Sequence, residues 1–183
     1  NLPPRSLKSI ILSVAWPAWM LGLNPSKKII AVSYSQALAN KHSQDCRAVI
    51  NAQWYKSVFP NTKINKGQDT KSKFVTSKCG FRFATSINST LTGEGADVII
   101  VDDPLTPLQA ATVKEREKVN YWFETTLSSR LNDKNTGAII LTMQRLHPND
   151  LAGYLAQKGN WNVIKLPAIA QIDEEYKLGS TTY

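Results

Sequence analysis

The chain of 183 residues is poor in metal-binding and disulfide-forming side chains, with only two cysteines and two histidines. Cys46 and Cys79 cannot form a disulfide framework or a metal knuckle, and we expect both to be reduced, buried thiols. His42 and His147 are too few and too far apart in sequence to indicate a zinc site. The composition therefore excludes a disulfide-stapled secreted domain.

Long apolar runs and acidic residues are also scarce. The best candidate for a membrane span, residues 10–23, is too short and is broken by Ser13 and Pro17, and no signal-peptide layout is present. Fourteen acidic residues stand against 22 basic ones, which gives a net charge of +8 and a pI near 9.5. We therefore expect a cytoplasmic protein with no membrane span. The charge favours a polyanionic partner (DNA, RNA or an anionic surface), although a merely basic protein remains the alternative.

The most informative stretch is Gly93–Pro104, in which four apolar residues end in Asp102 and Asp103. A short apolar run bounded by turn residues predicts a buried strand. Carboxylates at the end of such a strand suit a hard cation such as Mg²⁺, and one of them could hold the metal while the other faces a reacting water. The alternative for this stretch alone is a charged turn after a core strand.

Two further stretches carry polar groups at the boundaries of predicted elements. Pro3–Ser9 ends in a Lys-Ser pair before the apolar Ile10, which is typical of the tail of a phosphate-binding P-loop, although Leu7 stands where a glycine is usual. Residues 138–142 predict another buried strand, followed by Gln144 and Arg145. Because ligands in open α/β sheets bind at the carboxyl ends of the strands, the three stretches together predict a nucleotide hydrolase.

With these residues in place, the chain resembles the ATPase domain of the large terminase subunit of tailed bacteriophages and prophages. The family's deviant Walker A motif, Pro-Pro-Arg-x-x-Lys-Ser, is matched by residues 3–9, and its Walker B motif, Ile-Ile-Val-Asp-Asp-Pro, by residues 99–104. Further matches are the lead-in at residues 92–97, a Trp-Phe helix ending in Ser-Arg-Leu, and Arg-x-His-x-x-Asp-Leu at residues 145–151. The resemblance covers residues 3 to about 170.

The resemblance implies a role for each motif residue in ATP hydrolysis with Mg²⁺. Lys8 would neutralise the outer phosphates, and Ser9 with Asp102 would hold the metal. The expected phosphate-binding residues are Pro4, Arg5, Ser6, Leu7, Lys8 and Ser9. Asp103 would orient the attacking water, with Glu94 as its rival. Arg5 would stabilise charge on the γ-phosphate, and Thr142, Gln144 and Arg145 would couple the nucleotide to DNA.

Strands alternating with helices predict an α/β fold, a RecA-like P-loop three-layer α/β/α sandwich with a mostly parallel sheet. We expect residues 1–166 to form the ATPase domain and residues 167–183 a linker toward a nuclease domain. The chain starts just before the loop motif, so the strand that feeds the loop is expected to be missing. The resemblance implies double-stranded DNA, the portal protein, the small terminase subunit and a homo-oligomeric ring as partners.

The element boundaries follow from periodicity and turn residues. Helices are expected at residues 9–21, kinked near Pro17, and at residues 36–55, 112–131 and 149–158, the last capped by Asn149. Strands are expected at residues 28–35, 74–77, 81–85, 98–101, 138–142 and 161–166, with Arg82 on a polar face as a surface charge or as an arginine offered to a neighbouring subunit. The polar loop of residues 56–73, with Lys63, Lys66, Lys71 and Lys73, would contact DNA or would be merely solvated.

Two rival functions remain open at this stage. One is another P-loop DNA translocase, such as a superfamily 2 helicase, which predicts a second RecA-like domain. The other is an inactive prophage remnant that binds DNA without nucleotide, a reading motivated by Leu7. A two-metal nuclease built on Asp97, Asp102 and Asp103 would leave Lys8 and Ser9 unexplained.

Overall fold

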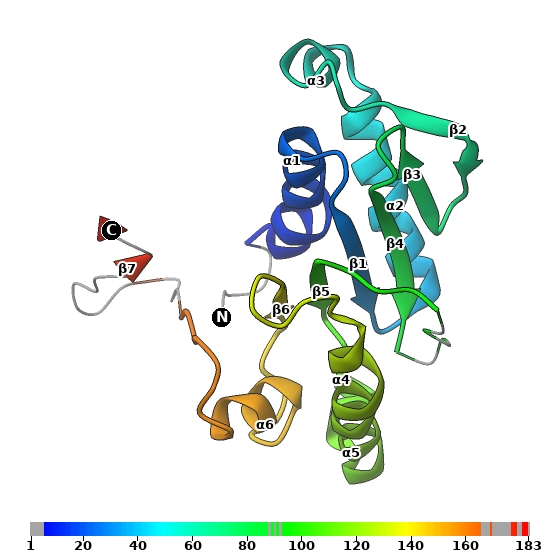
Figure 1. Cartoon of the computed structure of the whole chain (residues 1–183). Coiled ribbons are helices and arrows are strands. Elements are labelled where there is room, and N and C mark those ends of the chain that lie inside the picture. The colour runs from blue at the N-terminus through cyan, green and yellow to red at the C-terminus, as the bar shows by residue number, and fades with distance from the viewer. Residues whose placement is uncertain are drawn as a thin grey trace.

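A six-stranded sheet of order β2-β3-β4-β1-β5-β6 forms the centre of the computed structural model (Figure 1). The model describes residues 6–87, 89, 91, 93–165 and 169, with the backbone of residues 177–178 and 181–182. The strands are β1 (Lys28–Ser33), β2 (Ile64–Asp69), β3 (Lys73–Thr76), β4 (Phe81–Ser86), β5 (Val98–Asp102) and β6 (Ala138–Thr142). Strands β4, β1, β5 and β6 are mutually parallel, whereas β3 pairs antiparallel with both of its neighbours, β2 and β4. The sheet is therefore mixed but mostly parallel.

One face of the sheet is covered by the N-terminal helical segments. These are the π-helical turn η1 (Ile10–Ala15), α1 (Trp16–Leu23), α2 (Gln36–Asn51) and α3 (Gln53–Val58). Their apolar side chains pack on alternate residues of the central strands, among them Ile29, Val98 and Ile100. Tyr55 closes this layer and donates a hydrogen bond from its hydroxyl to the carbonyl of Ala18 at 2.6 Å.

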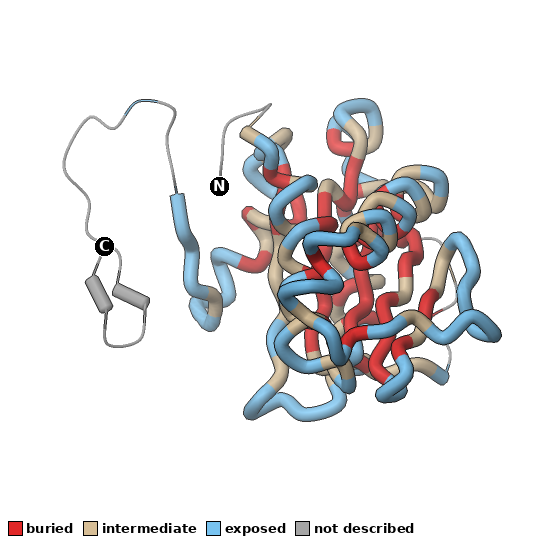
Figure 2. Tube along the Cα trace, turned by 90° about the horizontal axis from the view of Figure 1, so that it is seen from above, coloured by how far each residue is buried: buried red, intermediate tan, exposed pale blue. Residues whose placement is uncertain are grey.

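The opposite face is covered by α4 (Pro107–Ala111), α5 (Val113–Trp122), the π-helical η2 (Phe123–Leu127), the 3₁₀ turn η3 (Ser128–Arg130) and α6 (Leu151–Gln157). These elements bury the other alternate residues, including Ile30, Ile99 and Val101. The apolar runs of β1 and β5 are thus buried on both faces, as expected for central parallel strands. Figure 2 shows the buried residues gathered inside the fold with exposed loops around them.

The predicted α/β architecture, with helices on both sides of a mostly parallel sheet, is confirmed. The strands predicted at 98–101 and 138–142 and the hairpin of β3 and β4 are present. Lys177–Leu178 (β7) and Thr181–Thr182 (β8) form a separate antiparallel pair. Otherwise, the tail predicted as a linker, residues 167–183, lies almost wholly outside the described residues.

Several predicted helix boundaries were wrong for local reasons. The helix predicted at 9–21 is present, but it is π-helical over Ile10–Ala15 and α-helical over Trp16–Leu23, and Pro17 lies just after the junction of these two parts. The helix expected at 36–55 breaks at Ala52, which is extended, and the helix expected at 112–131 becomes π-helical at Phe123. The N-cap of α6 is Asp150 and not Asn149, since the Asp150 carboxylate accepts from Gly153 N at 2.9 Å.

Other corrections concern strands and exposure. Residues 64–69, predicted as loop, form β2, and residues 161–165, predicted as strand, have no regular structure. Cys79 is exposed at the β3–β4 turn, so only Cys46 is the buried thiol expected. Arg82 is not on a polar surface, because its side chain, on β4, is fully buried. On the first helix, Ile10 and Ile11 are 45% and 50% exposed, whereas Val14, Ala18 and Leu21 are buried.

Candidate nucleotide and metal site

The carboxyl ends of the central strands bring three of the predicted motifs to one edge of the sheet. Asp102, the last residue of β5, lies in register between Ser33 of β1 and Thr142 of β6. All three side chains are buried. The turn η1, which follows the Lys-Ser pair in sequence, packs against β5 at this edge. The parallel topology therefore places residues 8–9, 102–103 and 142–145 together, as the sequence predicted.

Two serine hydroxyls of the first helix donate to the Asp102 carboxylate. Ser9 Oγ donates to Oδ1 at 3.2 Å, and Ser13 Oγ donates to Oδ2 at 2.7 Å. The two serines are four residues apart and so lie on the same side of the helix. One carboxylate thus anchors the first turn of the helix to the end of β5.

Burial sets the electrostatics of this carboxylate. The pKa of Asp102 is raised, first because burial disfavours its charged form, while the hydroxyls of Ser13 and Ser9 act to lower it. His42 of α2 lies with Nδ1 3.7 Å from Asp102 Oδ2. Burial lowers the pKa of His42 and so favours the neutral imidazole, whereas the Asp102 carboxylate acts to raise that pKa.

Leu7, just before the helix, has an unusual backbone conformation. Leu7 has φ +57°, in the left-handed region that glycine adopts without strain. Its carbonyl accepts a hydrogen bond from Ile11 N at 2.9 Å, so the helix begins directly at this residue. Lys8 is only 8% exposed, and Ser6 is half-buried. The other predicted loop residues, Pro4 and Arg5, lie outside the described residues.

Asp103 occupies a second strained position at the same edge. Its φ is +44°, and its backbone N–H donates to the carbonyl of Thr142 at 2.9 Å while its own carbonyl accepts from Tyr34 N at 3.1 Å. The side-chain Oδ1 accepts from the backbone N–H of Gln144 at 3.1 Å. Two of the three predicted coupling residues thus contact Asp103 through their backbones, and the carboxylate is held in one direction.

Two other predicted site residues, Glu94 and Arg145, form ion pairs with residues other than Asp102 and Asp103. Glu94 forms an ion pair with Lys73 of β3 and precedes β5 in the chain, so it lies on the amino side of the strand whose carboxyl end carries Asp102. Arg145 donates from Nε to Asp150, which is fully buried, and from a terminal nitrogen to the carbonyls of His147 and Pro148. Arg145 therefore organises the loop between β6 and α6.

Sequence reasoning missed three members of the buried cluster, namely Ser13, His42 and Arg82. A serine four residues after Ser9 was a signal that could have been used, because helix periodicity puts both on one side. His42 and Arg82 come from other elements, and no linear motif connects them to Asp102. The third aspartate of the rejected nuclease model, Asp97, accepts from Lys28 N at the opposite edge of the sheet.

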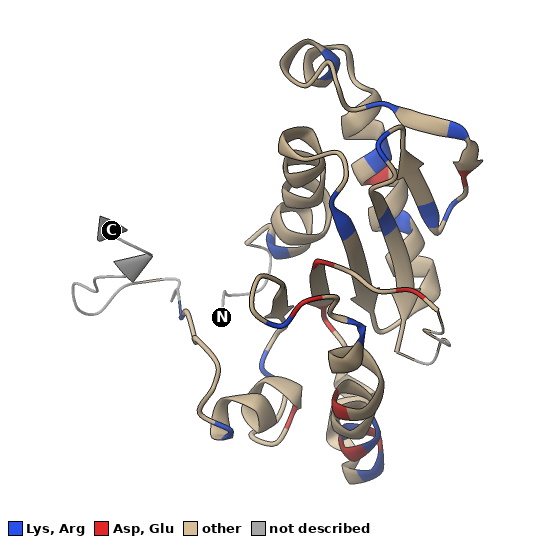
Figure 3. Cartoon of the chain, in the orientation of Figure 1, with Lys and Arg blue, Asp and Glu red and all other residues tan. Residues whose placement is uncertain are grey.

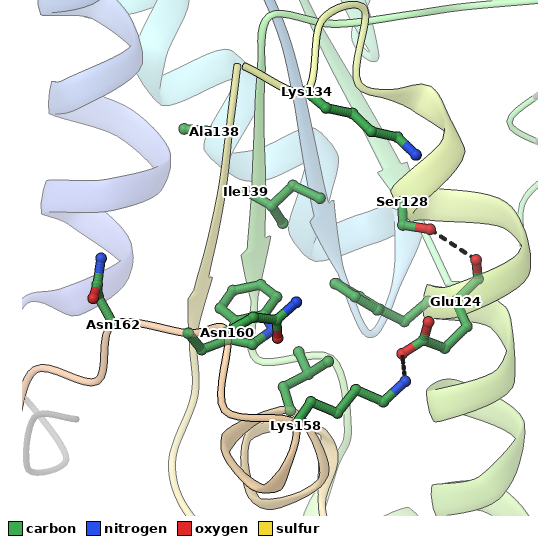
Figure 4. A pocket seen from close by; sticks show the side chains of 11 residues that line it. Glu124, Ser128, Lys134, Ala138, Ile139, Lys158, Asn160 and Asn162 are labelled. Atoms are coloured by element: carbon green, nitrogen blue, oxygen red, sulfur yellow. Dashed lines mark hydrogen bonds and ion pairs between the residues drawn. The ribbon is translucent and has the colours of Figure 1, made fainter. Parts of the chain in front are cut away.

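A separate cleft of about 530 Å³ opens beside the first residues of β6, between η2 and α6. Figure 4 shows Lys134, Lys158 and the asparagines Asn160 and Asn162 around it, with Lys158 paired to Glu124. The cleft lies toward the amino end of β6 and does not include the residues around Asp102. It is therefore distinct from the candidate site.

The residues at the site edge fit Mg²⁺ and a nucleotide phosphate. A hydroxyl and a carboxylate oxygen stand 3.2 Å apart at a helix start, and both are oxygen ligands that Mg²⁺ accepts. No cluster of three or more His, Cys, Asp or Glu able to hold a metal occurs in the described part of the chain. Mg²⁺ commonly takes one or two protein ligands and completes its shell with phosphate and water. Among the described helices, none has the length and apolar character needed to cross a membrane.

Comparison with known proteins identifies relatives in fold. No protein-family model and no curated protein matches the sequence. A mutant of the large terminase ATPase domain of Thermus phage P74-26 matches with a TM-score of 0.57 at 15% identity, over 79% of this chain and 58% of that one. The large terminase of bacteriophage HK97 matches with a TM-score of 0.47 at 14% identity, over 73% and 26%. The chain thus spans a little over half of the first of these structures, and its α/β fold is similar to that of the large terminase ATPase domain of Thermus phage P74-26.

Proposed function

We propose that this chain is the ATPase part of a phage large terminase subunit, which hydrolyses ATP with Mg²⁺ to drive double-stranded viral DNA into a prohead. The observation that supports this most directly is the contact of Ser9 Oγ with Asp102 Oδ1. It joins a Lys-Ser helix start to the acidic end of a buried strand, as a P-loop ATPase requires, on a fold shared with a terminase ATPase domain.

The chain's own residues supply binding and positioning at the site. Backbone N–H groups at the start of the helix would bind a phosphate group, and the Lys8 ammonium would add positive charge there. Ser9 would hold Mg²⁺ directly, and Asp102 would hold it through water. When bound, the metal neutralises charge that develops on the transferred phosphoryl group.

Asp103 is the proposed water-positioning residue. Its carboxylate is fixed by the N–H of Gln144 and lies one residue beyond the metal-binding aspartate. Glu94 is the weaker candidate because it is paired with Lys73 and precedes β5. Arg5, as a charge stabiliser for the γ-phosphate, remains a proposal from the motif alone.

Coupling is proposed to run through the residues after β6. A change at Asp103 would reach Thr142 through the Asp103 N–H to Thr142 carbonyl hydrogen bond, and Gln144 through the hydrogen bond from its N–H to the Asp103 carboxylate. Arg145 would pass it to α6, because its guanidinium binds the helix-capping Asp150 and the carbonyls of the connecting loop. An Arg145→Ala variant that hydrolyses ATP and translocates DNA with wild-type coupling would contradict this step.

The proposed DNA contact is a set of five exposed lysines, which we call the basic edge. Figure 3 shows Lys and Arg spread over α3 and the β2–β4 end of the sheet, whereas Asp and Glu are frequent on α5. None of the five has an ion-pair partner among the residues that the structure describes, unlike Lys73, which pairs with Glu94. The basic edge consists of Lys56, Lys63, Lys66, Lys71 and Lys78. The portal protein, the small terminase subunit and neighbouring copies in a ring are further proposed partners.

The first test is nucleotide binding and hydrolysis with Mg²⁺. Lys8→Ala should abolish ATP binding, and Asp102→Asn should abolish Mg²⁺-dependent hydrolysis with less effect on binding. Lys118→Ala, an exposed lysine of α5, is the matched control and should behave as wild type. Wild-type protein that binds no ATP would contradict the proposed function. If that protein still bound DNA, the result would favour an inactive DNA-binding remnant.

The second test is the salt dependence of DNA binding. Replacing Lys63, Lys66 and Lys71 by alanine should lower the slope of log affinity against log salt by roughly one unit for each lysine. A Lys114→Ala/Lys118→Ala variant on α5 is the control, because these lysines sit among glutamates. An unchanged slope in the triple variant would place the DNA elsewhere on the chain.

A further inference from the structure

Arg82 is the largest fully buried side chain of the described residues, and the proposed chemistry does not yet use it. It lies on β4, in register with Ile29 of β1 and Phe74 of β3, both of which are buried under the N-terminal helices. Its side chain therefore enters the layer formed by η1 and α2. Burial lowers the pKa of Arg82, because a charged guanidinium is costly in an apolar layer.

The guanidinium has one hydrogen bond in the described structure, and it leads to the metal site. One terminal nitrogen donates to the carbonyl of Ser13 at 2.9 Å. The hydroxyl of the same serine donates to Asp102 Oδ2 at 2.7 Å. Ser13 thus connects the buried arginine to the proposed metal-binding carboxylate.

Opposite charges make this connection more than a backbone contact. Asp102 is 1% exposed and lies on the same side of the sheet as Arg82, since Val98 and Ile100 of β5 pack in that layer. Asp45, the other acidic neighbour of Arg82, is paired with Lys41 at the surface. A buried charge is tolerated when an opposite charge compensates it, and Asp102 is the buried carboxylate available for that purpose.

The π-helical turn explains why an arginine is useful at this point. In η1 the regular backbone hydrogen bonding is shifted by one residue, and such turns occur frequently at functional sites. The donor from Arg82 ties the Ser13 carbonyl within this turn, and thereby fixes where the hydroxyls of Ser13 and Ser9 stand. Two nitrogens of Arg82, Nε and Nη1, have no hydrogen-bond partner among the described residues, so the side chain holds this turn and little else.

We propose that Arg82 is a positioning residue for the metal site, which holds the η1 turn by the Ser13 carbonyl and compensates the buried charge of Asp102. Its effect on activity rests on the proposed ATPase function, whereas its interaction with Asp102 does not. Arg82 would touch neither nucleotide nor metal. It would act by keeping Ser9 and Asp102 at the spacing that receives Mg²⁺.

The activity test compares Arg82 with a second buried arginine of the same chain. Arg116 of α5 is 6% exposed and donates to the carbonyl of Ala110 at 2.6 Å, but it packs on the opposite face of the sheet. Arg82→Met should raise the Mg²⁺ concentration for half-maximal ATP hydrolysis by about tenfold or more, the usual effect of losing an outer partner of a metal ligand. Arg116→Met should lower Tm without changing the Mg²⁺ dependence.

Charge rescue separates positioning from packing. Arg82→Lys keeps the positive charge and should recover part of the wild-type Mg²⁺ dependence, even if Arg82→Met is too unstable to assay. Equal Mg²⁺ dependence in the Arg82 variants and wild type would overturn the proposal. So would equal shifts in the Arg82→Met and Arg116→Met variants at matched loss of Tm.

A second test needs no nucleotide. In urea unfolding, Arg82→Met combined with Asp102→Asn should lose less stability than the sum of the two single losses, because each of these single changes leaves a buried charged group uncompensated. Arg116→Met combined with Asp102→Asn should be additive. Additive losses for the Arg82 and Asp102 pair would overturn the proposal. A wild type without ATP binding would end the proposed function, and the unfolding cycle would still decide the role of Arg82.

Discussion

Replacing Leu7 by glycine should stabilise the protein, although it deletes a whole leucine side chain. Leu7 is 65% exposed, so little packing is lost, and its φ of +57° places Cβ against the backbone. A left-handed conformation costs a non-glycine residue about 1–2 kcal/mol. The extra freedom of glycine in the unfolded chain offsets about 0.5–1 kcal/mol of that gain. The net expectation is a gain of about 1 kcal/mol, or a rise in Tm of about 2–4 °C for a chain of this size.

The matched control is Leu7→Ala, which removes the side chain but keeps Cβ. Because the strain resides in Cβ and the exposed side chain contributes little, the alanine variant should stay within about 0.5 kcal/mol of wild type. Thermal unfolding of the three proteins, without nucleotide, measures both effects. A Tm for Leu7→Gly below wild type, or an equal rise in Leu7→Ala, would refute the reasoning. ATP affinity should be kept in Leu7→Gly, since glycine is the usual residue at this position of a P-loop.

Three further predictions concern stability and reactivity away from the site. Burial raises the pKa of the Tyr55 hydroxyl from 10.0 to about 12, so between these pH values the native protein keeps a proton that the unfolded chain loses. The free energy of unfolding should therefore fall as pH rises from 10 to 12. Tyr55→Phe should remove that part of the decline, as measured by urea unfolding at alkaline pH. Cys79 should react with a thiol reagent in the native state, whereas Cys46, whose pKa burial raises to about 11, should react only on unfolding; two fast-reacting thiols would contradict this. Gly153→Ala should lower stability by about 1–3 kcal/mol in urea unfolding, because a Cβ there would stand 1.8 Å from the carbonyl oxygen of Pro148; a neutral effect would mean that the loop yields.

The central strands could be predicted because each consists of consecutive apolar residues. Residues 29–32 and 98–101 are uninterrupted apolar runs, a pattern typical of a strand that is covered on both faces. The strand β2 could not be predicted in this way. Its residues Ile64–Asp69 are mostly polar and exposed, and they form a strand because β3 offers a free edge for pairing.

Alternation misled the prediction at Arg82. The sequence Phe-Arg-Phe at 81–83 looks like a half-buried strand with a polar face, and that face was expected to meet solvent. However, β4 lies between β3 and β1, and the helix α2 packs on it. This interior strand has helices packed on it, so the alternate position is buried, and the Arg82 guanidinium donates to the carbonyl of Ser13 inside the protein. The order of strands, which a single sequence does not reveal, decided the outcome.

The two adjacent carboxylates at the end of the strand were predicted from the sequence. The structure shows that Asp102 and Asp103 make different contacts. Asp102 shares its side of β5 with Val98 and Ile100 and therefore turns toward the serines of the first helix. Asp103 follows the strand with φ +44° and is held by the chain that leaves β6. Because successive side chains of a strand point to opposite faces, one residue cannot take over the position of the other. If Asp102 binds the metal, Asp103 is the carboxylate that can position the attacking water. Exchanging the two roles would require a different backbone conformation at the end of β5.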